Sequence, residues 1–110
     1  MDWHKYFRES IIVCDKDLTV IYLNETAMKS LSEDERKTIV GSNLLDCHNE
    51  DSNKKILEIK ENLKSNIYTI EKAGKKKLIY QSPLLKNNEF NGIVEFSLEI
   101  PEVLPHFKRD

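Results

Sequence analysis

Residues typical of β-strands are concentrated at the two ends of the chain, and helix-forming residues occupy the middle. Near the start, "IIVCD" (11–15) and "LTVIYLN" (18–24) are short runs rich in β-branched residues. The polar "DKD" (15–17) between them favours a tight turn, so the two runs predict a β-hairpin. Both runs are apolar on either side, so we expect this hairpin to lie deep in a sheet and to be covered on one face.

The end of the chain predicts three further strands. The segment "NIYTIEKAGKKKLIYQSPLL" (66–85) indicates two strands around a turn at Ala73-Gly74, and the polar "KNNEFNG" (86–92) indicates a loop before the third. In "GIVEFSLEI" (92–100) polar and apolar residues alternate, as in a strand with one buried face. We expect the apolar set to face the helices, and it consists of Val94, Phe96, Leu98 and Ile100. Pro101 then ends the strand, since proline has no N–H for a ladder.

The middle of the chain predicts several short helices and one longer one. The first short helix can be capped by Asn24 or Thr26. The longer helix is expected to start near Ser52, with Asp51 or Ser52 as its cap, and to end at Asn66 in a left-handed conformation. Its apolar residues recur at helical spacing on one face, at Ile56, Ile59 and Leu63.

This order of elements predicts an α+β domain. A hairpin, a helical middle and three consecutive strands give a five-stranded antiparallel sheet with short helices covering one face. A ligand cavity is expected between the sheet and the helices. We predict that it is lined by Ile56, Ile59, Leu63, Phe96 and Tyr80.

Composition limits the classes of function. The 110 residues are 39% apolar and 33% charged, with a formal net charge of −2, which predicts a soluble single domain. The sequence has no basic face of the kind that binds nucleic acid. It also has no apolar run long enough to span a bilayer. The start of the chain lacks the apolar core of a signal peptide, and only two cysteines occur, so we expect a reduced cytoplasmic setting. The sequence contains neither a nucleophile–base pair nor a phosphate-binding glycine loop, so we do not expect an enzyme.

The chain resembles the PAS family of sensor domains. The resemblance is carried by "IIVCDKDLTVIYLNETAMKSL" (11–31), "IVGSNLLDCH" (39–48) and "KLIYQSPLLKNNEFNGIVEFSLEI" (77–100). The "DCH" (46–48) before a serine-started helix is similar to a bacterial PAS subgroup. The resemblance divides the chain into a helical cap at 1–9, a sensor domain at 10–101 and a tail at 102–110.

The resemblance implies a sensory and dimerising module rather than a catalyst. PAS domains bind haem, flavin, a small metabolite or nothing, and they signal to a kinase, a cyclase or a DNA-binding domain. The chain is therefore expected either to act on a signalling partner protein or to be a piece of a longer protein with an output domain.

The "DCH" segment has four possible roles. In the favoured structural role, Asp46 caps or braces a turn, Cys47 fills the core and His48 forms a local hydrogen bond, because no neighbouring residues complete a reactive site. In the alternative role, His48 is the axial ligand of haem in a gas or redox sensor, with Asp46 or Asp51 orienting its ring.

The other two roles involve cysteine chemistry. A photoactive flavin would need a reactive cysteine with arginine and glutamine neighbours, and Cys47 is displaced from that pattern. A zinc site could use Cys14, Cys47 and His48, but adjacent ligands are geometrically awkward and a fourth ligand is not evident.

Three aromatic residues precede the first strand at helical spacing. Trp3, Tyr6 and Phe7 would form one stripe on a short helix. Such a stripe either covers the domain's own sheet or packs against a second copy. We predict a homodimer in which these three residues form part of the interface.

Overall fold

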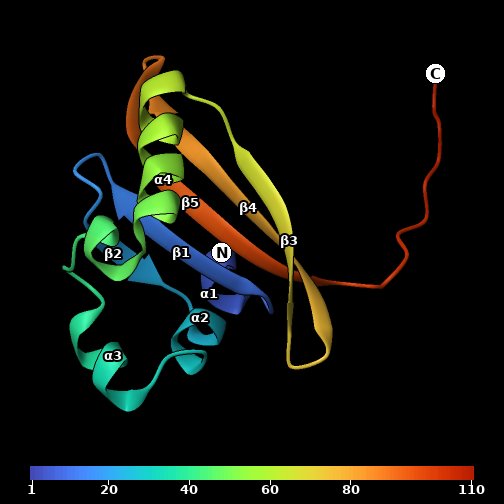
Figure 1. The fold of residues 1–110 in the computed structure, drawn as a ribbon, viewed down its shortest axis with the longest axis horizontal. Helices are drawn as coiled ribbons and strands as arrows, with labels where there is room; N and C mark the ends of the chain where they lie inside the picture. Colours follow the sequence, from blue (N-terminus) through green and yellow to red (C-terminus); the bar gives the residue numbers. More distant parts are fainter.

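The computed structural model describes residues 1–110, apart from the side chain of Cys47, and its centre is a five-stranded antiparallel sheet (Figure 1). The strand order is β2-β1-β5-β4-β3. The strands are β1 (Ser10–Asp15), β2 (Val20–Leu23), β3 (Asn66–Lys72), β4 (Lys75–Lys86) and β5 (Glu89–Ile100). The helices are α1 (Trp3–Tyr6), α2 (Glu25–Lys29), α3 (Glu33–Thr38), the 3-10 turn η1 (Leu44–Cys47) and α4 (Glu50–Asn62). The predicted α+β class and the antiparallel sheet are confirmed.

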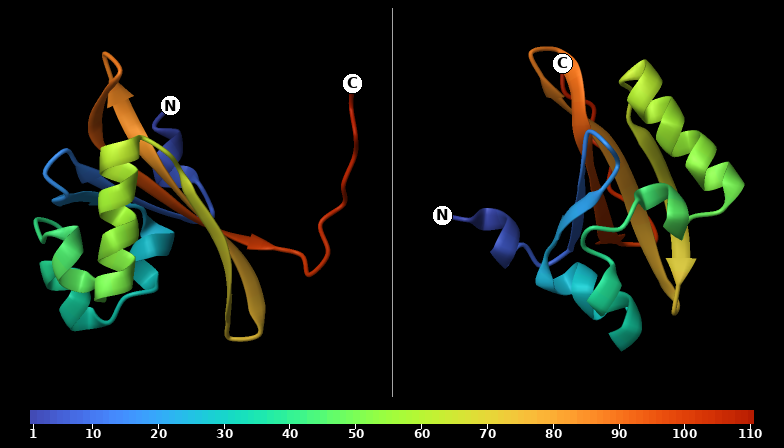
Figure 2. Two further views of the ribbon diagram at one scale, coloured as in Figure 1. Left: turned by 45° about the horizontal axis from the view of Figure 1, so that its top comes forward. Right: turned by 90° about the vertical axis from the view of Figure 1, so that its left-hand side faces the viewer.

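The sheet separates two sides of the molecule. Seen from its edge, α1 lies on one side, and η1 and α4 lie on the other (Figure 2, right). We call the side that carries α4 the inner face and the side that carries α1 the outer face. The chain after Ile100 leaves the sheet as an extended tail (Figure 1).

The core lies on the inner face in two clusters. Under α4, one cluster joins β1 and β5 to the helix and contains Cys14, Leu18, Ile56, Ile59 and Ile93. Beside it, α2 packs on β2 in a second cluster of Val20, Leu23 and Ala27. Leu44 of η1 packs against both clusters. The two clusters fix α2, η1 and α4 over one face of the sheet.

Asn24 is the cap of α2, as one of the two predicted alternatives had it. Its side-chain oxygen accepts hydrogen bonds from the backbone N–H groups of Ala27, at 3.0 Å, and Ile11, at 3.1 Å. Its side-chain nitrogen donates to the carbonyls of Glu9, at 2.7 Å, and Phe7, at 3.3 Å. One buried side chain therefore ties α2 to β1 and to the segment that precedes β1.

The longer helix starts near Ser52 as predicted, but its predicted cap and its predicted end residue are wrong. The cap of α4 is Asn49, whose side chain accepts from the N–H of Ser52 at 2.8 Å. Asp51 and Ser52 already lie inside the helix, and a cap needs non-helical backbone angles. At the other end, Leu63 is left-handed with φ of 55°, so the helix stops before Asn66. Leu63 is 38% exposed there and does not continue the buried stripe.

Two tight turns join the last three strands. The predicted turn at Ala73-Gly74 is confirmed, with both residues at positive φ. The expected loop at 86–92 is wrong, because β4 and β5 continue as paired strands up to a turn at Asn87-Asn88. Both asparagines have positive φ, which suits the turn type that matches the twist of a hairpin.

The prediction of which face of β5 meets the helices is also wrong. Ile93 belongs to the core under α4, and Glu95 lines a cavity beside Ile56. Phe96 points to the outer face and contacts Phe7, with ring centroids 5.9 Å apart. Alternation places the other apolar residues of β5 on the outer face with Phe96, namely Val94, Leu98 and Ile100.

Candidate functional site

A cleft opens between α4 and the inner face of the sheet. It has a volume of about 340 Å³. The start of α4 forms one wall, and β3 and β4 form the other. Its lining residues are His48, Asp51, Ser52, Lys55, Ile56, Asn66, Tyr68 and Gln81. The cleft is large enough for a small organic molecule.

A much smaller chamber adjoins the cleft beneath α4. Its volume is about 20 Å³, which is room for roughly one water-sized group. The chamber and the cleft share His48, Ile56 and Gln81, so the two spaces are neighbours. The remaining lining residues are Ile12, Cys14, Leu44, Ile93 and Glu95. Glu95 is the only carboxylate in this largely apolar lining.

A row of three polar side chains crosses the inner face. Asn66, Gln81 and Glu95 are register partners on β3, β4 and β5. The Asn66 amide donates to Gln81 Oε1 at 2.9 Å, and the Gln81 amide donates to Glu95 Oε1 at 2.8 Å. Gln81 is only 8% exposed. The site is therefore more polar at its base than the predicted apolar pocket.

Two pKa shifts show how far the charge of Glu95 acts. Burial raises the pKa of the Tyr68 hydroxyl, and the nearby Glu95 carboxylate raises it further. Burial also raises the pKa of the Cys14 thiol, with smaller contributions in the same direction from the Asp15 carboxylate and, less, from Glu95. Tyr68 lines the cleft and Cys14 lines the chamber, so the negative charge acts on both spaces.

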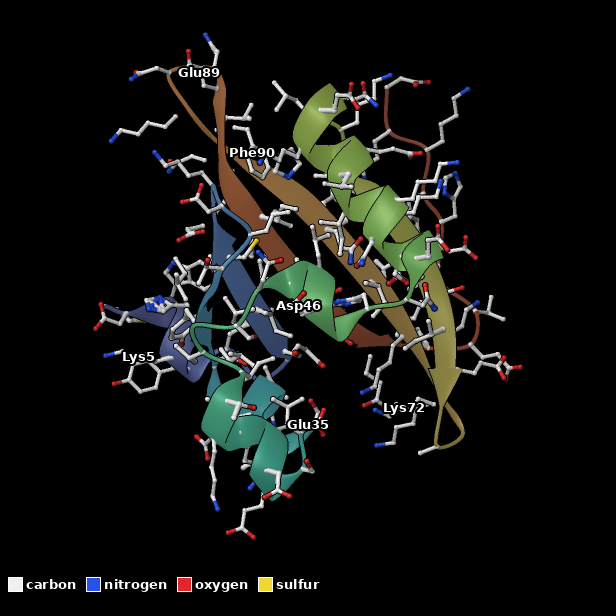
Figure 3. The ribbon with its side chains drawn as sticks, turned by 60° about the vertical axis from the view of Figure 1, so that its left-hand side comes forward. Lys5, Glu35, Asp46, Lys72, Glu89 and Phe90 are labelled. Atoms are coloured by element: carbon white, nitrogen blue, oxygen red, sulfur yellow. The ribbon has the colours of Figure 1, made fainter. Side chains whose placement is uncertain are left out.

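The "DCH" segment forms η1 and the entry to α4. His48 Nδ1 donates a local hydrogen bond to the Leu44 carbonyl at 2.8 Å, as the structural role predicted. Asp46 is exposed, and the caps of η1 and α4 are Asn43 and Asn49 instead. The expectations that involve the Cys47 side chain fall outside the described residues. Figure 3 shows Asp46 on η1, between the sheet and the start of α4.

The predicted pocket residues fall in three different places. Ile56 lines both the cleft and the chamber, and Ile59 belongs to the core cluster beside them. Leu63 ends α4 and is partly exposed. Tyr80 is the register partner of Phe96, so both lie on the outer face and the expectation that they line this pocket is wrong. Sequence reasoning missed Gln81 and Glu95. The signal that could have found them is the presence of a polar residue inside each of two predicted strands.

The outer face carries the aromatic stripe. Phe7 lies between Phe96 and Trp3, and its ring meets the Trp3 ring at 6.2 Å. On the other side of α1, His4 meets Tyr22 at 5.0 Å. Trp3 is still 55% exposed and Tyr6 is 74% exposed. The stripe therefore covers part of the sheet and leaves large apolar surfaces open.

The described part of the chain contains neither a metal-binding cluster nor a membrane-spanning helix. No group of three or more His, Cys, Asp and Glu side chains within it could hold a metal ion. No described helix combines the length and the apolar character that crossing a membrane requires.

Solved structures with a similar arrangement of sheet and helices identify the fold. No protein-family model and no curated protein matches the chain. A C-terminal domain from Streptococcus mutans aligns with a TM-score of 0.71 at 17% identity, over 88% of this chain and 79% of that one. The PAS domain of the histidine kinase ThkA aligns with a TM-score of 0.63 at 18% identity, over 82% and 98% of the two chains. The chain has the PAS fold.

Another solved structure with the PAS fold is named for its cofactor. The Aer2 receptor from Vibrio cholerae, described as a dual PAS-heme oxygen sensor, aligns with a TM-score of 0.61 at 16% identity, over 84% of this chain and 95% of that one. In the present PAS fold, the bond from His48 Nδ1 to Leu44 leaves Nε2 as the ring nitrogen able to bind iron. The inner wall, however, is crossed by the buried Gln81 amide and the partly buried Glu95 carboxylate, which do not suit the apolar face of a macrocycle.

Proposed function

We propose that this chain is a sensory signalling module that binds a small ligand in the cleft under α4. The observation that carries the proposal is the row of hydrogen-bonded polar side chains at the base of the cleft, in which Gln81 is buried and Asn66 and Glu95 are partly buried and which ends in the largely apolar chamber. Desolvating Gln81 and Glu95 costs free energy, and a packed core would be served better by apolar side chains at both positions. Polar groups that converge on a cavity are typical of a binding site.

The solved structures of similar fold support a signalling role. They include the PAS domain of a histidine kinase and a sensory box sensor histidine kinase from Vibrio cholerae. By analogy with them, we propose a cytoplasmic module that regulates a partner protein or an output domain by binding rather than by catalysis. Within the site, we propose that Ile56 forms the apolar wall, with Ile59 behind it.

We also propose that the module dimerises through its outer face. The register places an apolar set there, consisting of Val13, Tyr22, Ile67, Leu78, Tyr80, Val94, Phe96 and Leu98. Trp3, Tyr6 and Phe7 extend this surface and are partly exposed. Exposed apolar surface on this scale is typical of a protein–protein interface.

Light scattering tests the dimer. We expect a dimer at a concentration of about tens of micromolar, and a monomer for the double variant Trp3→Ala, Phe7→Ala. Phe107→Ala is the matched control, because Phe107 is an aromatic residue of the tail, 71% exposed. The control should stay dimeric. A monomeric wild type, or equal dissociation in both variants, would contradict the proposal.

If the dimer carries the signal, ligand binding and dimerisation are coupled. A panel of small molecules can be followed by the NMR signals of the Gln81 side-chain amide while the dimer fraction is measured in the same samples. We expect compounds that shift the Gln81 signals to change the dimer fraction as well. Compounds that bind in the cleft and leave the dimer fraction unchanged would contradict signalling through dimerisation.

The alternative function is a haem-based sensor with His48 as the axial ligand. The observation in its favour is the bond from His48 Nδ1 to the Leu44 carbonyl, which fixes the tautomer that iron prefers. Absorption spectra with added haemin decide between the two functions. Stoichiometric haem uptake by the wild type, abolished in His48→Ala, would establish the alternative and overturn the small-ligand proposal.

A further inference from the structure

We infer that the ligand of the cleft carries a primary ammonium group, which enters the small chamber and binds the Glu95 carboxylate. This inference rests on the proposed ligand-binding function and adds the chemical class of the ligand. It is drawn from the hydrogen-bond directions in the polar row, the charges around the chamber and the sizes of the two spaces.

The hydrogen bonds of the polar row are all donated toward Glu95, so the row ends at the acceptor oxygens of its carboxylate. Asn66 donates to Gln81, and Gln81 donates to Glu95. Glu95 Oε1 accepts the Gln81 bond, and Oε2 has no partner among the described residues. A carboxylate has only acceptor sites, so the group that completes this row must be a donor. An ammonium group provides three donors and no acceptor.

The Glu95 carboxylate also forms no ion pair within the described chain, and Lys72 and Lys77, which line a neighbouring hollow with it, lie beyond ion-pair distance. The ion pairs of the described chain are all formed by other acidic residues, and none includes Glu95. Its negative charge contributes to the raised pKa of Tyr68, which lines the cleft, and, less than Asp15 does, to that of Cys14, which lines the chamber. A cation in the chamber would neutralise this charge and strengthen the bond that it accepts. An anion in the chamber would be repelled by the same carboxylate.

The two volumes fit a molecule with a small head and a larger body. The chamber, at about 20 Å³, holds one water-sized group, and an ammonium group has that size. The cleft of about 340 Å³ receives the remainder, against Ile56 and Tyr68. At the mouth, Asp51 and Lys55 carry opposite charges, so the mouth does not select one sign. Selection by charge is therefore assigned to Glu95.

Three probes of nearly equal size separate charge from shape. The probes are n-butylamine, n-butanol and butyrate, which at neutral pH are cationic, neutral and anionic. Each is titrated up to about 0.1 M, because ligands this small bind weakly. The readout is the NMR shift of the Gln81 side-chain amide, which borders both the cleft and the chamber. We expect saturable shifts with the amine at a roughly tenfold lower concentration than with the alcohol, and the weakest response with butyrate.

The variants test the assignment to Glu95. Glu95→Gln keeps the size of the side chain and removes its charge, and it should bring amine binding to the level of the alcohol. Glu89→Gln is the matched control on the same strand, and Figure 3 shows Glu89 at the tip of the β4–β5 hairpin. The control should bind the amine as the wild type does. If Glu95→Gln does not fold, the comparison of the three probes on the wild type still decides the class.

The outcomes also separate this inference from the proposed function. Equal binding of alcohol and amine, or tighter binding of butyrate, would overturn the ammonium class while the cleft would still be a ligand site. Unchanged amine binding in Glu95→Gln would overturn the role of Glu95. Failure of every probe to shift the Gln81 amide would contradict both the ammonium class and the proposed site.

Discussion

Replacing Asn24 by alanine should remove a large part of the stability of the domain. The side chain is 2% exposed and makes hydrogen bonds to Ala27, Ile11, Glu9 and Phe7. A typical hydrogen bond contributes about 1 kcal/mol net, and a buried group left without a partner costs about 1–3 kcal/mol. Asn24→Ala removes all of these bonds at once, so we expect a loss of about 4 kcal/mol. Domains of this size unfold with about 5–15 kcal/mol.

Urea denaturation measures this loss. With a slope of about 2 kcal/mol per molar urea, the midpoint should fall by about 2 M. Asn62→Ala is the control, because Asn62 is exposed at the end of α4, and its effect should stay within about 0.5 kcal/mol. A loss below about 1 kcal/mol for Asn24→Ala, or equal losses for the two variants, would refute the reasoning.

The Asn24→Asp variant separates the two halves of the network. It keeps the oxygen that caps α2 and loses the nitrogen that donates to the carbonyls of Phe7 and Glu9. It should therefore be destabilised at neutral pH and regain stability as the pH falls, because a protonated carboxyl group can donate to one of these carbonyls. Stability that does not rise on acidification, relative to the wild type, would show that the donor half contributes little.

Two further predictions concern β1 and its pairing with β5. Gly92→Ala should be far more destabilising than Gly74→Ala when the two variants are unfolded in urea. Both glycines have positive φ, but only at Gly92 would the new Cβ collide with a backbone atom, the Cys14 carbonyl oxygen. In a Cys47→Ser background, Cys14 should react with iodoacetamide much more slowly in the folded than in the unfolded protein, because it is buried and its thiol pKa is raised from 9.0. The raised pKa favours the protonated thiol in the fold, so its contribution to stability is complete below about pH 9 and is lost as the pH rises through the folded pKa.

The fold was more predictable from sequence than the site. The turn at Ala73-Gly74, the Asn24 cap and the five strands all depend on local signals that the tertiary structure does not reverse. The extent of β5 was underestimated because Asn87-Asn88 forms a tighter turn than a polar segment of that length suggests.

The site was mispredicted because periodicity does not say which face is covered. Alternation correctly grouped Phe96 with its apolar neighbours, but it could not place them relative to α4. The assumption that the more apolar face meets the helices fails here, since α1 covers part of the outer face and Glu95 points inward. The pairing of Gln81 with Glu95 depends on strand register, which no local signal in either strand encodes.

The alternation along β5 places the two sides of the molecule very close together in the covalent chain. Glu95 borders the chamber, and Phe96, the next residue, touches the aromatic stripe through Phe7. Neighbouring residues of a strand are joined by one rigid peptide unit and point to opposite faces, so a rotation of that unit moves both side chains. A displacement of Glu95 in the cavity is therefore passed to Phe96 and to the surface under α1 through one peptide unit, without a relay through other residues.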